Sequence, residues 1–194
     1  MSRVRSFVLA SLIVVGTQAA GAAVVWDEGV HGDLSNDRLA PTPLVLQVGT
    51  NTIIGTTVQG DVDYFGIGVF GDARLTQIVL TSFTSADDLA FLAIQSGSFI
   101  TETTTAPNVA NLLGWTHPSA ALVGTDILDN LAAGAGAIGF TPPLGPGFFS
   151  FWMQQTQPQV VGYSFDLVVV PEPSVAALLA LGLGALAIAR RGHA

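Results

Sequence analysis

Short apolar or alternating runs fill the middle of the chain, and Gly, Pro, Asn and Asp separate them at intervals of about ten residues, a pattern typical of β-strands. The alternation is clearest near the end of this region. Tyr163, Phe165 and Leu167 share one face there. Ser164 and Asp166 point to the other face. The strands predicted from these runs are 44–48, 52–58, 64–70, 74–83, 89–95, 137–140, 148–154 and 162–170.

The pattern weakens between 101 and 135, where Thr, Asn, Gly and Ala dominate. We expect a longer excursion at 123–133 with room for one short helix, which Asp126 would cap and Asp129 would favour from its first turn. Many short strands separated by turn residues predict an antiparallel sandwich or barrel.

Both ends of the chain are more apolar than the middle. Arg3 and Arg5 precede an apolar stretch at 7–15, which is the layout of a signal peptide. That stretch is too short to cross a bilayer of about 30 Å, which disfavours a retained N-terminal anchor. We expect signal peptidase to cut after Ala22 or, alternatively, after Ala23. The small residues expected at the signal-peptidase site are Ala20, Ala22 and Ala23.

The C-terminal segment has three parts. Proline, glutamate and proline at 171–173 interrupt the preceding strand, because proline donates no ladder hydrogen bond and restricts the residue before it. An uncharged apolar run at 174–189 follows, and as a helix it would be about 24 Å long, enough for a thin bilayer. Two arginines close the run and would stay on the cytoplasmic side.

This arrangement resembles the PEP-CTERM sorting signal. The resemblance implies recognition by an exosortase, which is a membrane-embedded cysteine protease, and cleavage near the Pro-Glu-Pro. It also implies an inner-membrane anchor before processing and delivery to the surface or extracellular matrix of a Gram-negative bacterium afterwards. Without processing, the segment would be an ordinary membrane anchor. The residues expected to form the sorting signal are Pro171, Glu172, Pro173, Arg190 and Arg191.

The region between the two ends resembles a bacterial pre-peptidase C-terminal domain. The segments that carry the resemblance are, in order, 33–37, 41–56, 60–67, 87–94, 145–152 and 163–169. It implies a jelly-roll-like β-sandwich but no single activity, because such domains accompany secreted proteases and many other exported proteins. The expected fold is therefore all-β: an antiparallel jelly-roll-like β-sandwich at 23–170, flanked by a signal helix within 1–22 and a transmembrane helix at 174–189 of the tail, 171–194.

Charge and composition exclude several functions. The chain has no lysine and no cysteine, which excludes disulfides and thiolate metal sites. Between 23 and 170, thirteen acidic residues face only Arg38 and Arg74, a formal charge of −11. Nucleic-acid binding requires clustered basic residues, so we expect none. Docking on anionic lipid is disfavoured for the same reason.

Paired carboxylates are the main candidates for chemistry. Asp61 and Asp63 would project on one face of a strand, and Asp87 with Asp88 forms a second pair. Like charges this close favour either a bound cation or simple exposure, and hard oxygen ligands suit calcium. The favoured interpretation of Asp61 and Asp63 is a pair of exposed turn carboxylates; the first alternative is a calcium site at these two residues, and acid–base catalysis is the second. No other cofactor is expected.

Nothing in the sequence forms a recognisable catalytic constellation. His31 and His117 are the only imidazoles between the two ends, and the chain has no Gly-x-Ser-x-Gly, His-Glu-x-x-His or phosphate-loop motif. Ser119 follows His117 in what we interpret as a polar turn. Trp115 in a loop is the tryptophan expected to contact a sugar, whereas Trp152 is expected to pack in the core or at a sheet edge.

The expected function is non-enzymatic: an exported surface or matrix module that contributes to exopolysaccharide or biofilm material. The alternative is a specific glycan-binding or protein-binding module, and a hydrolase is the least favoured. The expected partners are signal peptidase, exosortase, extracellular polysaccharide and, through the tail, the membrane.

Overall fold

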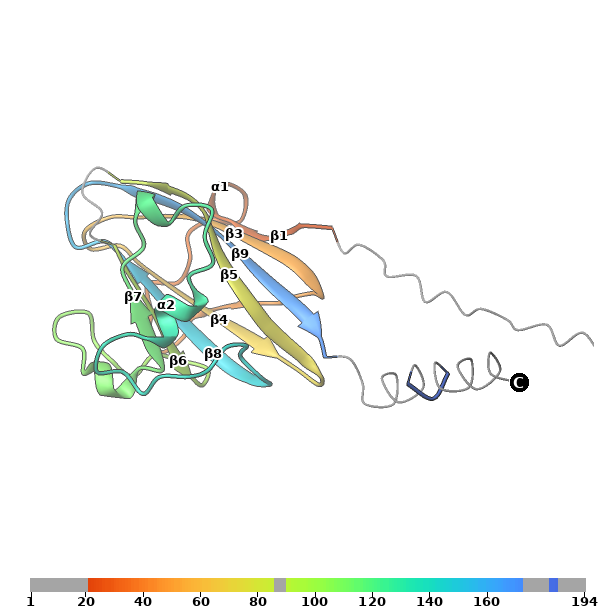
Figure 1. Cartoon of the computed structure of the whole chain (residues 1–194). Helices are drawn as coiled ribbons and strands as arrows, with labels where there is room; N and C mark the ends of the chain where they lie inside the picture. Colours follow the sequence, from red (N-terminus) through yellow and green to blue (C-terminus); the bar gives the residue numbers. More distant parts are fainter. Residues whose placement is uncertain (1–20, 86–89, 173–181, 185–194) are drawn as a thin grey trace, which may run out of the picture.

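Nine strands form two mixed sheets among the residues that this computed structural model describes, 21–85, 90–172 and 182–184 (Figure 1). The first sheet has the order β1 (Ala23–Asp27), β3 (Gly49–Thr57), β9 (Val161–Pro171) and β5 (Ala73–Thr84). The second has the order β2 (Thr42–Leu44), β4 (Val62–Val69), β8 (Gly147–Gln154), β6 (Phe91–Ser96) and β7 (Gly114–Thr116). Short helical segments connect strands: α1 (Glu28–His31), η1 (Val109–Asn111), η2 (Ala120–Leu122) and α2 (Leu128–Ala132).

The first four strands alternate between the two sheets, which makes both sheets mixed. The chain reverses direction at each connection, so strands two apart in sequence run the same way. Strand β1 therefore pairs in parallel with β3, and β2 pairs in parallel with β4. The central pairings are antiparallel, between β3 and β9, β9 and β5, β4 and β8, and β8 and β6. The prediction of purely antiparallel sheets is thus wrong at these two edges.

Alternating side chains of both sheets meet in one core. Along β9, Tyr163, Phe165 and Leu167 are buried, as their period of two predicted. In β4 the buried Phe65 alternates with Gly66, and Phe65 stacks on Phe151 of β8 with ring centroids 4.9 Å apart. These side chains belong to a single cluster that draws on both sheets, so burial between the sheets is what holds the two layers together.

A second, smaller cluster covers part of the outer face of the second sheet. Tyr64 of β4 and Trp152 of β8 project outward there, and the segment around η1 packs over them through Ile100 and Leu112. Trp152, which was expected to pack in the core or at a sheet edge, is completely buried.

Several predicted boundaries are wrong. Residues 45–48 are not a strand, because the chain uses them to cross from one sheet to the other, and Val45 is 81% exposed. Residues 137–140 are not a strand either; the N–H groups of Ile138 and Gly139 bind the carbonyls of residues 112 and 113 in a loop. Strands β1 and β7 were missed, since both are short edge strands without a long alternating run. The short helix expected in 123–133 is present as α2.

Some predictions fall outside the described residues. These include most of the signal peptide, Pro173 with the terminal arginines, and the pair Asp87 and Asp88. The predicted transmembrane run also lies outside, apart from one described helical turn at 182–184. Within the described part of the chain, no helix is both long and apolar enough to cross a membrane.

Two phenylalanines of β8 provide a matched test of this core. Phe151→Ala removes a ring that is 1% exposed and should lower the free energy of unfolding by about 3–5 kcal/mol, because it leaves a cavity between the sheets. Phe148→Ala, on the same strand but 58% exposed, should change it by no more than about 0.5 kcal/mol. Urea unfolding of the two variants measures the difference, and equal losses would contradict this assignment of the core.

Candidate metal centre

Three carboxylates reach one place from separate parts of the chain. Strand β1 ends at Asp27, whose side chain accepts a hydrogen bond from a backbone N–H of α1 and so starts that helix with Glu28. Gly32 ends α1 with φ of 87°, a left-handed conformation that turns the chain and brings Asp33 back toward the sheet. Asp63 is the second residue of β4.

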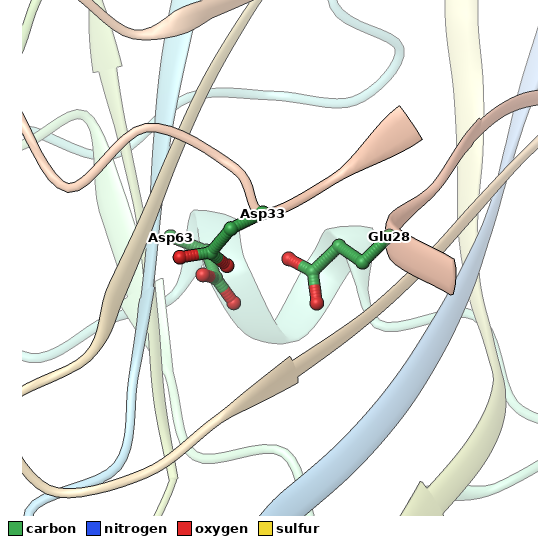
Figure 2. A group of neighbouring side chains, drawn as sticks. All are labelled: Glu28, Asp33 and Asp63. Carbon is green, nitrogen blue, oxygen red and sulfur yellow. The ribbon is translucent and has the colours of Figure 1, made fainter. Parts of the chain in front are cut away.

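The three side chains converge (Figure 2). One oxygen atom each from Glu28, Asp33 and Asp63 lies within 4.8 Å of the other two. Ligands on opposite sides of a calcium ion, each at about 2.4 Å, are about 4.8 Å apart. The spacing is therefore compatible with three oxygens on one calcium ion.

Backbone and side-chain donors hold the two outer carboxylates in place. The Oε2 atom of Glu28 accepts from the backbone N of Thr56 at 2.7 Å and from its hydroxyl at 3.1 Å. The Oε1 atom accepts from the backbone N of Leu34 at 3.3 Å. The Oδ2 atom of Asp33 accepts from the Asn36 amide at 3.4 Å. Glu28 thus ties α1 to strand β3 and to the loop that carries Asp33.

Asp63 is the unusual member, because its side chain is fully buried. Its Oδ2 atom accepts a hydrogen bond of 2.7 Å from the hydroxyl of Tyr163, which is also buried. Its Oδ1 atom is buried and has no hydrogen-bond partner. A buried carboxylate oxygen without a partner is costly, so this atom requires a proton or a cation.

Tyr163 reaches Asp63 because of a glycine on the neighbouring strand. Gly55 of β3 is the register partner of Tyr163 on β9. A Cβ atom at Gly55 would collide with the phenol ring and hydroxyl of Tyr163. The missing side chain therefore lets the phenol lie across β3 toward the carboxylate cluster.

Burial and mutual repulsion raise the pKa values of all three carboxyl groups. Burial raises the pKa of Asp63 to about 8, and the charges of Glu28, Asp61 and Asp33 push it the same way, although the Tyr163 hydrogen bond opposes them. Burial also raises the pKa of Glu28, with a further contribution from Asp33. The pKa of Asp33 rises through burial and the nearby charge of Asp61.

No basic side chain of the described residues neutralises these carboxylates. The Arg38 guanidinium donates to the carbonyls of residues 100 and 101, and Arg74 pairs with Glu172 at 2.9 Å. A cavity of about 440 Å³ opens beside the cluster, lined in part by Glu28, Asp33 and Thr56. An ion from solvent could therefore reach Glu28 and Asp33, which offer hard oxygen ligands of the kind that calcium prefers.

The sequence identified one of these three residues. It predicted Asp61 and Asp63 as a pair, but Asp61 precedes β4 and accepts from the Asn36 amide at 3.1 Å instead of joining the group. Glu28 and Asp33 were missed. The only signal in the sequence was their acidic character in an N-terminal segment, and nothing in that segment shows which later strand it meets.

The other singled-out side chains bind the backbone or neighbouring rings. Trp115 lies in β7 and not in a loop; its indole N–H donates to the carbonyl of residue 135 at 3.0 Å, and its ring stacks on Phe91 at 5.9 Å. The Nδ1 atom of His117 lies 2.8 Å from the carbonyl oxygen of residue 90. The ring of His31 stacks on Trp26 at 5.0 Å.

Comparison with known proteins found no relative: the chain matches no family model, no curated protein and no solved structure.

The raised pKa of Asp63 predicts how stability depends on pH without metal. Between about pH 4 and 8 the folded protein keeps a proton on Asp63 that the unfolded chain releases, since the folded pKa is about 8 and the usual value is 3.8. This contribution to stability is fully present below pH 4 and is lost as the pH rises through 8. In chelator, the Tm of the wild type should therefore fall relative to that of Asp63→Asn over this window. If the Tm of the wild type and that of Asp63→Asn changed with pH in the same way, the assignment of the raised pKa to Asp63 would be wrong.

Proposed function

We propose that this chain is an exported, non-catalytic β-sandwich module that binds calcium through Glu28, Asp33 and Asp63. The observation that carries the proposal is the buried, unpartnered Oδ1 atom of Asp63 beside two further carboxylates. The described residues place no arginine against it, so a cation from outside would supply the missing positive charge. Binding would release the proton that Asp63 holds below its raised pKa.

The position of the centre suggests what the ion does. Glu28 and Asp33 belong to the N-terminal segment that includes β1, an edge strand, whereas Asp63 belongs to the second sheet. An ion held by all three would join this segment to the opposite sheet. Since the domain has no disulfide to strengthen it outside the cell, calcium would serve as that link.

Calcium should stabilise the wild-type protein and fail to stabilise one specific variant. At a calcium concentration about a hundredfold above Kd, the Tm should rise by roughly 5–10 °C. Asp63→Asn keeps the size of the side chain and a carbonyl acceptor for Tyr163 but removes the charge, so the rise should disappear. Asp61→Asn is the matched control and should keep it. Thermal unfolding in calcium and in chelator measures both, and an equal rise in wild type and Asp63→Asn would refute the proposed centre.

The destination we propose is the cell surface or extracellular matrix, where the module contributes to exopolysaccharide or biofilm material. The resemblance of 171–194 to a PEP-CTERM sorting signal supports this route, with signal peptidase and exosortase as processing partners and Gram-negative export as the setting. Its first residues are well placed: Pro171 ends β9, and Glu172 forms an ion pair with Arg74. The cleavage segment therefore begins where the folded body ends.

A second candidate function is glycan binding, with an extracellular polysaccharide as ligand. It is favoured by a cavity of about 260 Å³ on the outer face of the second sheet, next to the stacked Phe91 and Trp115. Phe91, His117 and Gln154 line this cavity and combine an aromatic face with polar edges.

Sorting can be tested by the intact mass of protein isolated from its host. The mass should lack the signal peptide and everything after the Pro-Glu-Pro region. Replacing Pro171 and Pro173 together with Ala should preserve a mass that includes Arg191. A native protein that retains Arg191 without any substitution would show plain anchoring instead.

A further inference from the structure

Large apolar side chains are exposed together at the end of the body from which the C-terminal tail leaves. We name this group the tail-proximal rim; its members are Val45, Val48, Phe70, Phe148 and Val170. Phe70 is 64% exposed and Phe148 is 58% exposed. Their rings contact each other edge to face, with centroids 5.4 Å apart. Two exposed, interacting phenylalanines are unusual on a water-facing surface, which indicates that something covers them.

Strand register places these residues together. Strand β4 ends at Val69, opposite Gly147 at the start of β8. The chain then turns into β5, whose first residue, Ala73, pairs with Pro171 at the end of β9 (Figure 1). The N–H of Glu172 also donates to the carbonyl of residue 72 at 2.8 Å. The turn that carries Phe70 is thus bonded directly to the point where the tail begins.

The rim encloses a shallow apolar groove. Gly66 and Gly68 leave the outer face of β4 without side chains, and Phe70 folds back over Gly68. The resulting cavity is about 310 Å³, with Phe148 among its walls.

Charge is distributed away from this end. Among the described residues, the acidic and basic side chains at the tail exit are Asp72, Arg74 and Glu172, and Arg74 forms an ion pair with Glu172. The carboxylate centre lies at the opposite end of β4, because Asp63 precedes Val69 by six residues, roughly 20 Å along a strand. The body is therefore acidic at one end and apolar, with little net charge, at the other.

The tail has almost no linker. Only Glu172 and Pro173 separate Pro171 of β9 from the apolar run that starts at Ser174. Three residue steps span at most about 11 Å. The headgroup layer on each side of a bilayer is about 5–8 Å thick. If the run enters the bilayer, the rim must therefore lie within or against the headgroups.

We propose that the tail-proximal rim is a membrane-facing surface that rests on the interface of uncharged, zwitterionic lipid until the tail is cut. This inference rests on the proposed function, because it needs the tail to insert. Aromatic side chains are favoured at the interface between membrane and water, and the groove offers apolar surface to it. Anionic lipid is disfavoured as the partner, because the body carries a net negative charge and has no basic cluster to attract it. Cutting the tail removes the tether, and the rim then leaves the membrane with the body.

The absence of cysteine from the chain allows a direct test with single labels. The full chain, carrying Phe148→Cys with an environment-sensitive fluorophore, is reconstituted into phosphatidylcholine vesicles. Val160→Cys is the matched control, because Val160 is 60% exposed next to β9's first residue, at the opposite end. The label at 148 should emit at shorter wavelength, lose emission to lipids spin-labelled near the headgroup, and resist an aqueous quencher. The label at 160 should show none of these effects.

Vesicle flotation separates the two proposals. A chain that does not float with vesicles lacks an inserted tail, which overturns the proposed membrane stage and the rim surface with it. A chain that floats while labels 148 and 160 respond alike overturns the rim surface alone. A label at 148 that is shielded from water but not quenched by spin-labelled lipid also overturns it, since protein would then cover the rim.

Discussion

Strand β9 forms antiparallel ladders with β3 on one side and β5 on the other, and this double pairing positions the main features of the molecule. Its inward face supplies Phe165 and Leu167 to the core between the sheets. Another inward residue of this strand, Tyr163, donates a hydrogen bond to the buried carboxylate of Asp63. Its last residue, Pro171, fixes where the tail leaves. Because side chains alternate strictly along a strand, a shift of one residue in this register would turn the core face outward and separate Tyr163 from Asp63.

The two ends of the folded body differ in chemical character, since one end is acidic and the other is apolar. At one end, carboxylates gather in a partly buried cluster, and burial raises the pKa of Asp63 within it. At the other end, Phe70 and Phe148 expose apolar rings beside the tail exit. A body tethered by a two-residue linker would hold its apolar end at the lipid and its acidic end away from it. The membrane stage proposed above would therefore need no electrostatic attraction between the acidic domain and the lipid.

Local pattern predicted the long strands because their burial alternates with every residue. The run that became β9 and the alternation of Phe65 with glycine in β4 could be recognised without tertiary information. Local pattern did not predict the short edge strands β1 and β7. Each pairs with one neighbouring strand, and neither has an extended alternation of apolar and polar residues. For residues 137–140 the error was the opposite one, because a strand was predicted where the structure has a loop. The backbone N–H groups of this apolar run donate to carbonyls of another loop instead of to a neighbouring strand.

The amino-acid sequence by itself determined that the chain is mostly β, that its middle region is acidic and free of cysteine, and that apolar segments lie at both ends, because composition and periodicity are local properties. It also marked Asp63, through its neighbour Asp61, as a candidate ligand. Only the tertiary structure decided that Glu28 and Asp33 join Asp63 and that Asp61 does not. It alone gathered Phe70 and Phe148 beside Pro171. These groupings depend on which strands become neighbours, and that choice follows from packing across the whole core, which no local stretch of sequence encodes.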